Sequence, residues 1–139
     1  MSKTKGGCQC GAVRYQSEAE PMLSIICHCR QCQRASGTIG NTFIAVPKAA
    51  VEITGEVRYF ETKGDSGKPV HRGFCPTCGS RMFGLADAAP DLIAISAGSM
   101  DDPSTFKPGM HVYTGAAQPW DRIHDDLPAF PAMPPMEGN

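Results

Sequence analysis

The chain has 139 residues, a net charge of −1 and 19% charged residues, which allows one domain with a genuine hydrophobic core. It lacks the basic runs of a nucleic-acid binder and the stretch of roughly 20 apolar residues that spans a bilayer. We therefore expect neither nucleic acid nor a membrane as partner. The first residues also lack the apolar segment of a secretory signal, which favours a cytoplasmic location.

Short segments of alternating apolar and polar residues follow one another along the chain. In residues 11–17, for example, the apolar Val13 and Tyr15 alternate with polar neighbours. Only residues 30–35 and 101–106 are predicted to form a helical turn. An all-β sandwich or folded-over sheet is therefore expected, with nine strands over residues 11–17, 22–27, 42–46, 51–54, 57–61, 70–74, 80–85, 92–96 and 110–114.

The C-terminal part of the chain changes in composition. We predict a single domain over residues 1–130 and a mobile, proline-rich tail over residues 131–139. The segment before the tail contains apolar residues that are expected to dock it on the body: Trp120, Ile123, Leu127 and Phe130.

Seven cysteines fall into three clusters: Cys8-Gln-Cys10, Cys27-His-Cys29-Arg-Gln-Cys32 and Cys75-Pro-Thr-Cys78. In a cytosolic chain such spacings favour metal binding over disulfides, and the odd number of thiols agrees. On a strand Cys8 and Cys10 would point to one side, and the third cluster is typical of a tight turn. Together these two pairs could close a structural zinc site, which we prefer to iron or to a redox-active CxxC motif.

The central cluster has three thiols, and no fourth cysteine remains for it. Cys27 and Cys29 are predicted to share a strand face, and Cys32 to return after a turn. Catalytic zinc keeps three protein ligands and one exchangeable position, so this cluster predicts a second zinc that is open to water or substrate. His28 should point to the opposite face, either packed or exposed to solvent. The alternative is that a distant histidine completes the site: His71, His111 or His124.

The spacing leaves the pairing of the clusters open. Cys27 and Cys29 could instead close a site with Cys75 and Cys78, leaving Cys8, Cys10 and Cys32 over. A zinc held by three thiolates is a weak Lewis acid, and its softness suits a sulfur donor as the fourth ligand. Binding would deprotonate a thiol there, so the residues point to a small thiol or thiol adduct as ligand.

Several motifs together resemble one family: Gly6-Gly-Cys-Gln-Cys-Gly11, Cys27-His-Cys-Arg-Gln-Cys32 with Ser36-Gly37, Phe74-Cys-Pro-Thr-Cys-Gly-Ser80, His111-Val-Tyr, and Pro119-Trp120 through Asp126-Leu-Pro-Ala-Phe130. The chain is similar to the glutathione-dependent formaldehyde-activating enzymes, also called centromere-protein-V-like. The resemblance implies a β-tent fold and a carbon–sulfur lyase that joins formaldehyde to glutathione or reverses that reaction. It also implies two zinc ions per chain, a structural one on Cys8, Cys10, Cys75 and Cys78 and a catalytic one on Cys27, Cys29 and Cys32.

Residues beside the central cluster are candidates for substrate contacts. Arg30 and Arg34 could pair with a carboxylate of glutathione, or could be solvated surface charges. Trp120 could cap the pocket, although anchoring of the tail is favoured. Two other functions stay open: a non-catalytic zinc module, and a redox sensor whose thiols release metal on oxidation. The chain could be a monomer or a homodimer.

Overall fold

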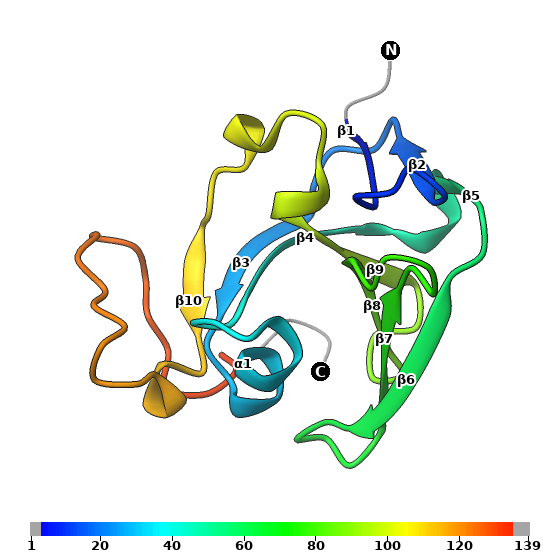
Figure 1. Cartoon of the computed structure of the whole chain (residues 1–139). Helices are drawn as coiled ribbons and strands as arrows, with labels where there is room; N and C mark the ends of the chain where they lie inside the picture. Colours follow the sequence, from blue (N-terminus) through cyan, green and yellow to red (C-terminus); the bar gives the residue numbers. More distant parts are fainter. Residues whose placement is uncertain (1–3, 135–139) are drawn as a thin grey trace. The chain divides into compact units, whose positions relative to one another are not determined.

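The computed structural model describes residues 4–134, which form short strands, one seven-residue α-helix and several single 3₁₀ turns (Figure 1). The all-β prediction is confirmed, with mostly antiparallel strand pairs. The chain divides into two compact units, the first of residues 1–23 and 44–106 and the second of residues 24–43 and 107–139. The single domain over residues 1–130 stays a prediction.

The first unit has two groups of strands. One is an antiparallel sheet in the order β1 (Thr4–Gly7), β2 (Arg14–Ser17) and β5 (Val51–Thr54). The other follows the order β4 (Asn41–Pro47), β9 (Leu92–Ser96), β8 (Arg81–Ala86), β7 (Pro69–Phe74) and β6 (Arg58–Lys63). Its 3₁₀ turns are η1 (Lys48–Ala50), η2 (Ala97–Ser99) and η3 (Pro103–Thr105).

The hydrophobic core of this unit joins the two groups of strands. Tyr15 of β2 packs edge-on against Phe83 of β8, with ring centroids 5.3 Å apart, and its hydroxyl is 2.7 Å from that of Ser99. Burial raises the pKa of Tyr15 to about 12, and the bond to Ser99, which lowers it, offsets only part of this effect. The core also includes Val13, Ile44, Val46, Met82, Ile93 and Ile95, all at most 2% exposed.

The second unit is built around a parallel pair of strands. β3 (Leu23–Cys27), which begins at the boundary of the units, pairs with β10 (Met110–Val112) so that Val112 lies opposite Cys27. The helix α1 (Arg30–Ser36) follows β3, and η4 (Thr114–Ala116) follows β10. Residues 128–130 run beside β10, because the backbone N–H groups of His111 and Phe130 donate to the carbonyls of Pro128 and His111.

All nine predicted strands are present, with ends within three residues of those expected. One strand, β1, was not predicted because Thr4-Lys-Gly-Gly has no apolar alternation. Glycine is needed at position 6 for a steric reason, since a Cβ there would lie 2.2 Å from the Tyr15 hydroxyl. A strand whose glycine makes room for a tyrosine side chain therefore cannot be found from a pattern of apolar residues.

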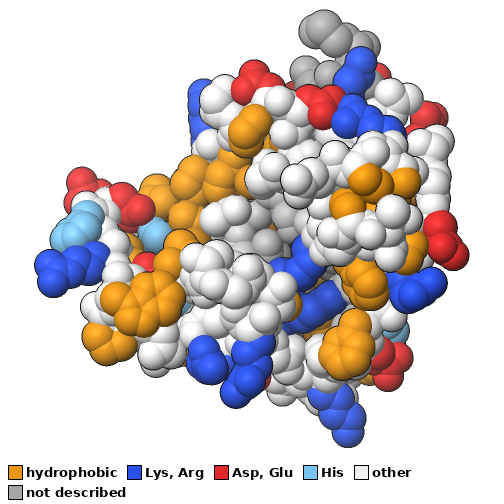
Figure 2. All heavy atoms as spheres, in the orientation of Figure 1, with side chains coloured by type: hydrophobic (Ala, Val, Ile, Leu, Met, Phe, Trp, Pro, Cys, Tyr) orange, Lys and Arg blue, Asp and Glu red, His pale blue; other side chains and the backbone are white. Residues whose placement is uncertain are grey.

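The predicted mobile tail is in part held in place. The carbonyls of Pro131 and Ala132 accept hydrogen bonds from the backbone N–H groups of Gly115 and Tyr113. The rest of the tail, residues 135–139, lies outside the described residues. No helix within residues 4–134 is long and apolar enough to cross a membrane. On the face shown in Figure 2, lysine and arginine side chains lie among acidic and apolar ones.

Candidate metal centres

The first pair of cysteines lies in the turn that joins β1 to β2, and not on a strand as predicted. β1 ends at Gly7, and the backbone then turns through Gly11, which has a φ of 84° and donates to the Cys8 carbonyl at 3.2 Å. The backbone N–H of Val13 donates to the Sγ atom of Cys8 at 3.2 Å. The turn, rather than strand alternation, brings the sulfurs of Cys8 and Cys10 to 3.6 Å from each other.

The third cluster lies in the turn between β7 and β8, as predicted. The backbone N–H of Cys75 donates to the Ser80 carbonyl at 3.0 Å, and that of Gly79 donates to the Cys75 carbonyl at 2.8 Å. The Ser80 hydroxyl lies 3.2 Å from the Sγ atom of Cys78. The same hydroxyl accepts the backbone N–H of Gln9 at 3.1 Å, which ties the two cysteine turns together.

The four sulfurs of these turns lie within 4.8 Å of one another and could hold a metal ion. Two of the separations are 3.6 Å, between Cys8 and Cys10, and 3.8 Å, between Cys10 and Cys75. Zinc–sulfur bonds of about 2.3 Å at tetrahedral angles place sulfurs about 3.8 Å apart. The donor atoms and their separations therefore fit a tetrahedral zinc ion.

The thiols of this centre differ in acidity. Hydrogen bonds from the Ser80 hydroxyl and backbone N–H lower the pKa of Cys78 to about 5. The backbone N–H of Ala12 lowers the pKa of Cys10, but the neighbouring thiols and desolvation outweigh it and raise that pKa to about 11. Crowded thiols ionise together only when a cation offsets their charge, which agrees with a metal-binding role.

The central cluster is formed where β3 ends and α1 begins. Cys27 is the last residue of β3, Cys29 is the N-cap of α1, and Cys32 lies inside the helix. The predicted common strand face of Cys27 and Cys29 is therefore wrong, because β3 ends between them. The three sulfurs nevertheless lie within 4.8 Å of one another and could hold a metal ion. Cys27 and Cys32 are 7% and 5% exposed, whereas Cys29 is more open.

Mutual contact dominates the chemistry of these three thiols. The pKa of Cys27 is raised far above its ordinary value, first by its contacts with Cys29 and Cys32 and then by burial. One sulfur is already polarised as an acceptor, since the backbone N–H of Cys32 donates to the Sγ atom of Cys29 at 3.3 Å. A bound cation would offset the charge that makes ionisation of this group costly, so the donor set fits a soft divalent metal.

Within residues 4–134, no fourth ligand atom of a cysteine, histidine or acidic residue joins the central cluster. The histidines that were candidates to complete it have other contacts or are exposed. Both ring nitrogens of His111 are used elsewhere, and Nε2 of His71 lies 3.1 Å from Asp87. His124 is exposed. Three protein sulfurs are therefore the ligand set that the described residues offer.

His28, between two of these cysteines, is packed and only 1% exposed. Its backbone N–H donates to the Val112 carbonyl at 3.0 Å, and its carbonyl accepts from the Gln33 side chain at 2.7 Å. Its ring Nδ1 lies 2.6 Å from an oxygen of Asp121, and its Nε2 lies 2.9 Å from Nδ1 of His111. Every polar atom of His28 therefore has a partner.

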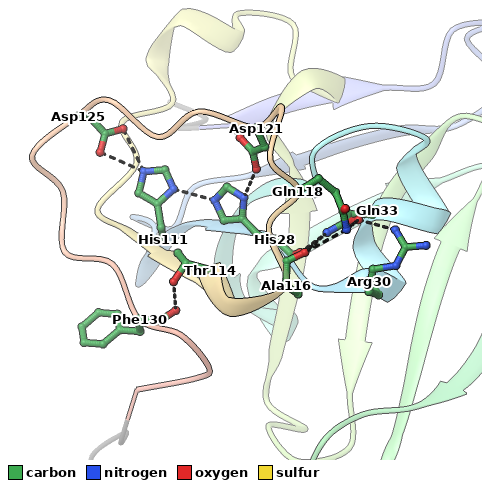
Figure 3. A network of polar contacts seen from close by, with 10 residues as sticks. All are labelled: His28, Arg30, Gln33, His111, Thr114, Ala116, Gln118, Asp121, Asp125 and Phe130. Carbon is green, nitrogen blue, oxygen red and sulfur yellow. Dashed lines mark hydrogen bonds and ion pairs between the residues drawn. The ribbon is translucent and has the colours of Figure 1, made fainter.

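The two histidines form the middle of a chain of polar contacts with a carboxylate at each end (Figure 3). Nε2 of His111 lies 3.0 Å from an oxygen of Asp125. Carboxylates accept hydrogen bonds, so Nδ1 of His28 and Nε2 of His111 are the donors in the contacts with Asp121 and Asp125. His111 also lowers the pKa of Asp125 by donating to it.

The predicted substrate contacts lie at or near α1. The Arg30 guanidinium donates to the Gln33 side-chain oxygen at 2.5 Å, and Arg34 is exposed in the last turn. Trp120 is 64% exposed, and the interpretation that it anchors the tail stays a prediction. Their roles as substrate contacts stay predictions.

Sequence reasoning missed Asp121, Asp125 and Gln33 as parts of this region. Gln33 is 5% exposed and its amide donates to the carbonyls of His28 and Ala116, while its oxygen accepts from Arg30 and Gln118. A polar residue beside a ligand cysteine is one available signal. The partners of that residue are distant in sequence, and no local pattern connects them.

Two comparisons agree with this arrangement. A sequence model of a family described as "Glutathione-dependent formaldehyde-activating enzyme" matches residues 3–116, which include all seven cysteines. The fold is similar to that of a Rhodobacter sphaeroides protein known from a crystal structure, with a TM-score of 0.57 and 16% sequence identity. The match covers 91% of this chain and 98% of that one. On the extent of the sequence match, the chain belongs to the glutathione-dependent formaldehyde-activating enzyme family.

Proposed function

We propose that the protein is a zinc-dependent carbon–sulfur lyase that joins a small thiol, with glutathione as the leading candidate, to formaldehyde, or splits that adduct. In this proposal residues 1–130 form the functional domain and the protein acts in the cytoplasm. Cys8, Cys10, Cys75 and Cys78 hold a structural zinc, and Cys27, Cys29 and Cys32 hold a catalytic one. The observation that carries the proposal is the second cluster, which has three thiols within 4.8 Å and no fourth described ligand.

The reaction needs a thiolate and a nearby source of protons. The sulfur attacks the carbonyl carbon, the π electron pair moves to the oxygen, and that oxygen takes a proton to give a hydroxymethyl thioether. Zinc, when bound, would supply a coordination position that favours the thiolate form of the substrate. The chain itself supplies the soft ligand set, and Arg30 and Arg34 are proposed to orient the carboxylates of the thiol.

The proposal is tested by exchange spectroscopy of formaldehyde with glutathione and with a panel of other small thiols. We expect wild-type protein to accelerate exchange for at least one thiol, and Cys32→Ala to lose that acceleration together with one of two zinc ions. Arg34→Gln should raise KM for a thiol that carries carboxylates more than for cysteamine, which carries none. If every thiol exchanges at the rate of buffer, the catalytic assignment fails.

The burial of Cys27 and Cys32 favours a second candidate, a zinc-binding module without catalysis. A closed cluster is typical of structural zinc, whereas chemistry requires that a substrate reach the metal. Metal content separates these cases together with exchange rates. Two zinc ions with acceleration support the enzyme, while one or two zinc ions without acceleration support the module.

A further inference from the structure

Hydrogen bonds link the segment from Ala116 to Asp125 to the loop that carries the three cysteines. Asp121 contacts the His28 ring, and the Ala116 carbonyl accepts from the Gln33 amide. The two donors, His28 and Gln33, are immediate sequence neighbours of the proposed ligands. Asp121 and Asp125 themselves lie beyond residue 116, where the match to the family ends. The described contacts therefore extend the surroundings of this centre past the residues that the family model matches.

The contacts are buried, which makes them costly to leave unmade. The side chains of His28 and His111 are 1% and 5% exposed, and that of Asp121 is 7% exposed. Removing one partner would leave a buried polar group without a hydrogen bond, and this would destabilise the folded conformation of the loop. The side chain of Asp125 differs, because it is 46% exposed and water can replace it as a partner of His111.

The position of His28 decides what these bonds restrain. Its backbone connects Cys27 to Cys29, so fixing its N–H, carbonyl and ring fixes the direction in which the two flanking side chains leave the backbone. The third cysteine, Cys32, precedes Gln33, whose amide is held by two carbonyls. The spacing of the three sulfurs therefore depends on residues that are not ligands.

We propose that His28, His111 and Asp121 are positioning residues that hold the three-cysteine loop in its metal-binding conformation. We call these three residues, with Asp125 as a weaker outer member, the histidine clamp. The clamp acts through the protein backbone between the ligands. Loss of groups that orient metal ligands typically lowers metal affinity by about 10- to 100-fold, and we expect a loss of that size here.

The inference rests on the metal assignment of the proposed function, but not on the lyase reaction. Its test titrates a competing chelator into the Co²⁺-loaded protein, with the loss of sulfur-to-metal charge-transfer absorption as the signal. Each molecule contains an internal reference, because the four-cysteine centre lies in the other unit and shares no residue with the clamp. We call the four-cysteine centre the first centre and the three-cysteine centre the second. We expect Asp121→Ala to lower the metal affinity of the second centre about 10- to 100-fold and to leave that of the first unchanged.

A graded set of variants separates positioning from general loss of stability. Asp121→Asn keeps an oxygen that accepts from His28 and should lose less affinity than Asp121→Ala. Asp125→Ala should lose least, because water can take the place of that exposed carboxylate. A purely structural role would lower the melting temperature without changing the ratio of the two affinities or the Co²⁺ absorption of the second centre, measured well below melting.

Two controls match the clamp variants. Asp126→Ala removes an exposed neighbouring carboxylate. Asp87→Ala removes the carboxylate partner of another histidine, His71, in the first unit. Neither should alter the second centre. If Asp121→Ala fails to fold, Asp121→Asn and Asp125→Ala still decide, because the proposal requires Asp121→Asn to weaken the second centre more than Asp125→Ala does.

The outcomes keep the two proposals apart. Unchanged affinity of the second centre in Asp121→Ala, or equal losses at both centres, overturns the histidine clamp and leaves the proposed lyase standing. Binding of a single Co²⁺ by the wild-type protein overturns the metal assignment, and the clamp with it. Two bound ions, with selective and graded weakening of the second, support the clamp even if no thiol reacts.

Discussion

Gly40 illustrates how one residue constrains the second centre. Its φ is 155°, a backbone conformation that favours glycine, and a Cβ would lie 1.9 Å from the Cys27 carbonyl oxygen. Since backbone atoms cannot move aside as a flexible side chain can, any substitution has to displace the end of β3. Gly37 differs, because its φ of 75° caps α1 but nothing lies within 4 Å of an added Cβ.

These glycines give a graded prediction. Gly37→Ala should destabilise the protein by about 1 kcal/mol through its left-handed backbone alone. Gly40→Ala should cost more and should also weaken metal binding at the second centre, because it displaces Cys27. Gly98→Ala is the control, as it meets neither a close atom nor an unfavourable φ. Chemical denaturation with parallel zinc analysis measures both effects, and equal results for Gly37→Ala and Gly40→Ala would contradict the steric argument.

The ion pair of Arg14 and Asp101 lies within the first unit and is open to solvent. The guanidinium donates to both carboxylate oxygens, at 2.9 and 2.5 Å, while the side chains are 47% and 51% exposed. The arginine holds the pKa of Asp101 below its usual 3.8. Because the carboxyl binds a proton less readily when folded, the pair stabilises the protein above that pH and ceases to do so as the pH falls through the lowered pKa.

Removing the arginine should therefore raise the pKa of Asp101. We expect Arg14→Gln to move the Asp101 carboxyl resonance in an NMR titration to a midpoint nearer 3.8. The pKa of Asp125, which is lowered by His111, should stay unchanged and serves as the control. Added salt should shrink the difference between wild type and variant, since an exposed pair is screened. An unchanged Asp101 midpoint would show that the pair does not persist in solution.

At the scale of elements, α1 and the second centre share an atom. The Sγ atom of Cys29 accepts the backbone N–H of Cys32 and so acts as the N-cap of the helix. A proposed metal ligand thereby also satisfies one of the free N–H groups at the start of a seven-residue helix. Such a short helix gains little from its own backbone bonds, so caps and packing decide whether it forms.

Serine and alanine at position 29 separate these two roles. Cys29→Ser keeps an oxygen that can cap the helix but is a poor soft-metal ligand, whereas Cys29→Ala removes both functions. We expect both variants to lose the second zinc. Without metal, Cys29→Ser should be more stable than Cys29→Ala by about 1 kcal/mol in chemical denaturation. Equal stabilities would mean that the cap contributes nothing.

The sequence predicts elements well where side chains alternate, and poorly where a turn or a distant partner sets the structure. Val13 and Tyr15 alternate with exposed neighbours and mark β2, whereas Cys8 and Cys10 form a hairpin turn that resembles a strand in sequence. The proximity of the three central thiols follows from their spacing. The contact between His28 and His111 requires the parallel pairing of β3 with β10, which no local pattern specifies.

At the scale of the whole molecule, each metal centre is contained in one compact unit. The first centre joins two hairpin turns, and the contact of 3.8 Å between the sulfurs of Cys10 and Cys75 spans 65 residues. Closing a loop of that length restricts the unfolded chain. For a covalent cross-link across 65 residues, the loss of chain entropy amounts to about 4 kcal/mol. A metal at this position should therefore be a main source of stability for the first unit.

Loss of one ligand from the first centre tests this estimate. Cys78→Ala should remove one of two zinc ions and lower the free energy of unfolding by about 4 kcal/mol. Thr77→Ala, at the exposed neighbouring position, should change neither. Zinc analysis and denaturant unfolding give both quantities. A variant that loses zinc but keeps wild-type stability would show that this metal does not hold the fold together.

The histidine clamp has a consequence for how the protein is made on the ribosome. Cys8, Cys10, Cys27, Cys29 and Cys32 precede Cys75 in the sequence, so five early thiols are available to bind an ion in the wrong combination. Asp121 and Asp125 follow all seven cysteines in the sequence. If the proposed clamp holds, the contacts of these carboxylates with His28 and His111 would favour Cys27, Cys29 and Cys32 as one centre only after residue 125 has been made.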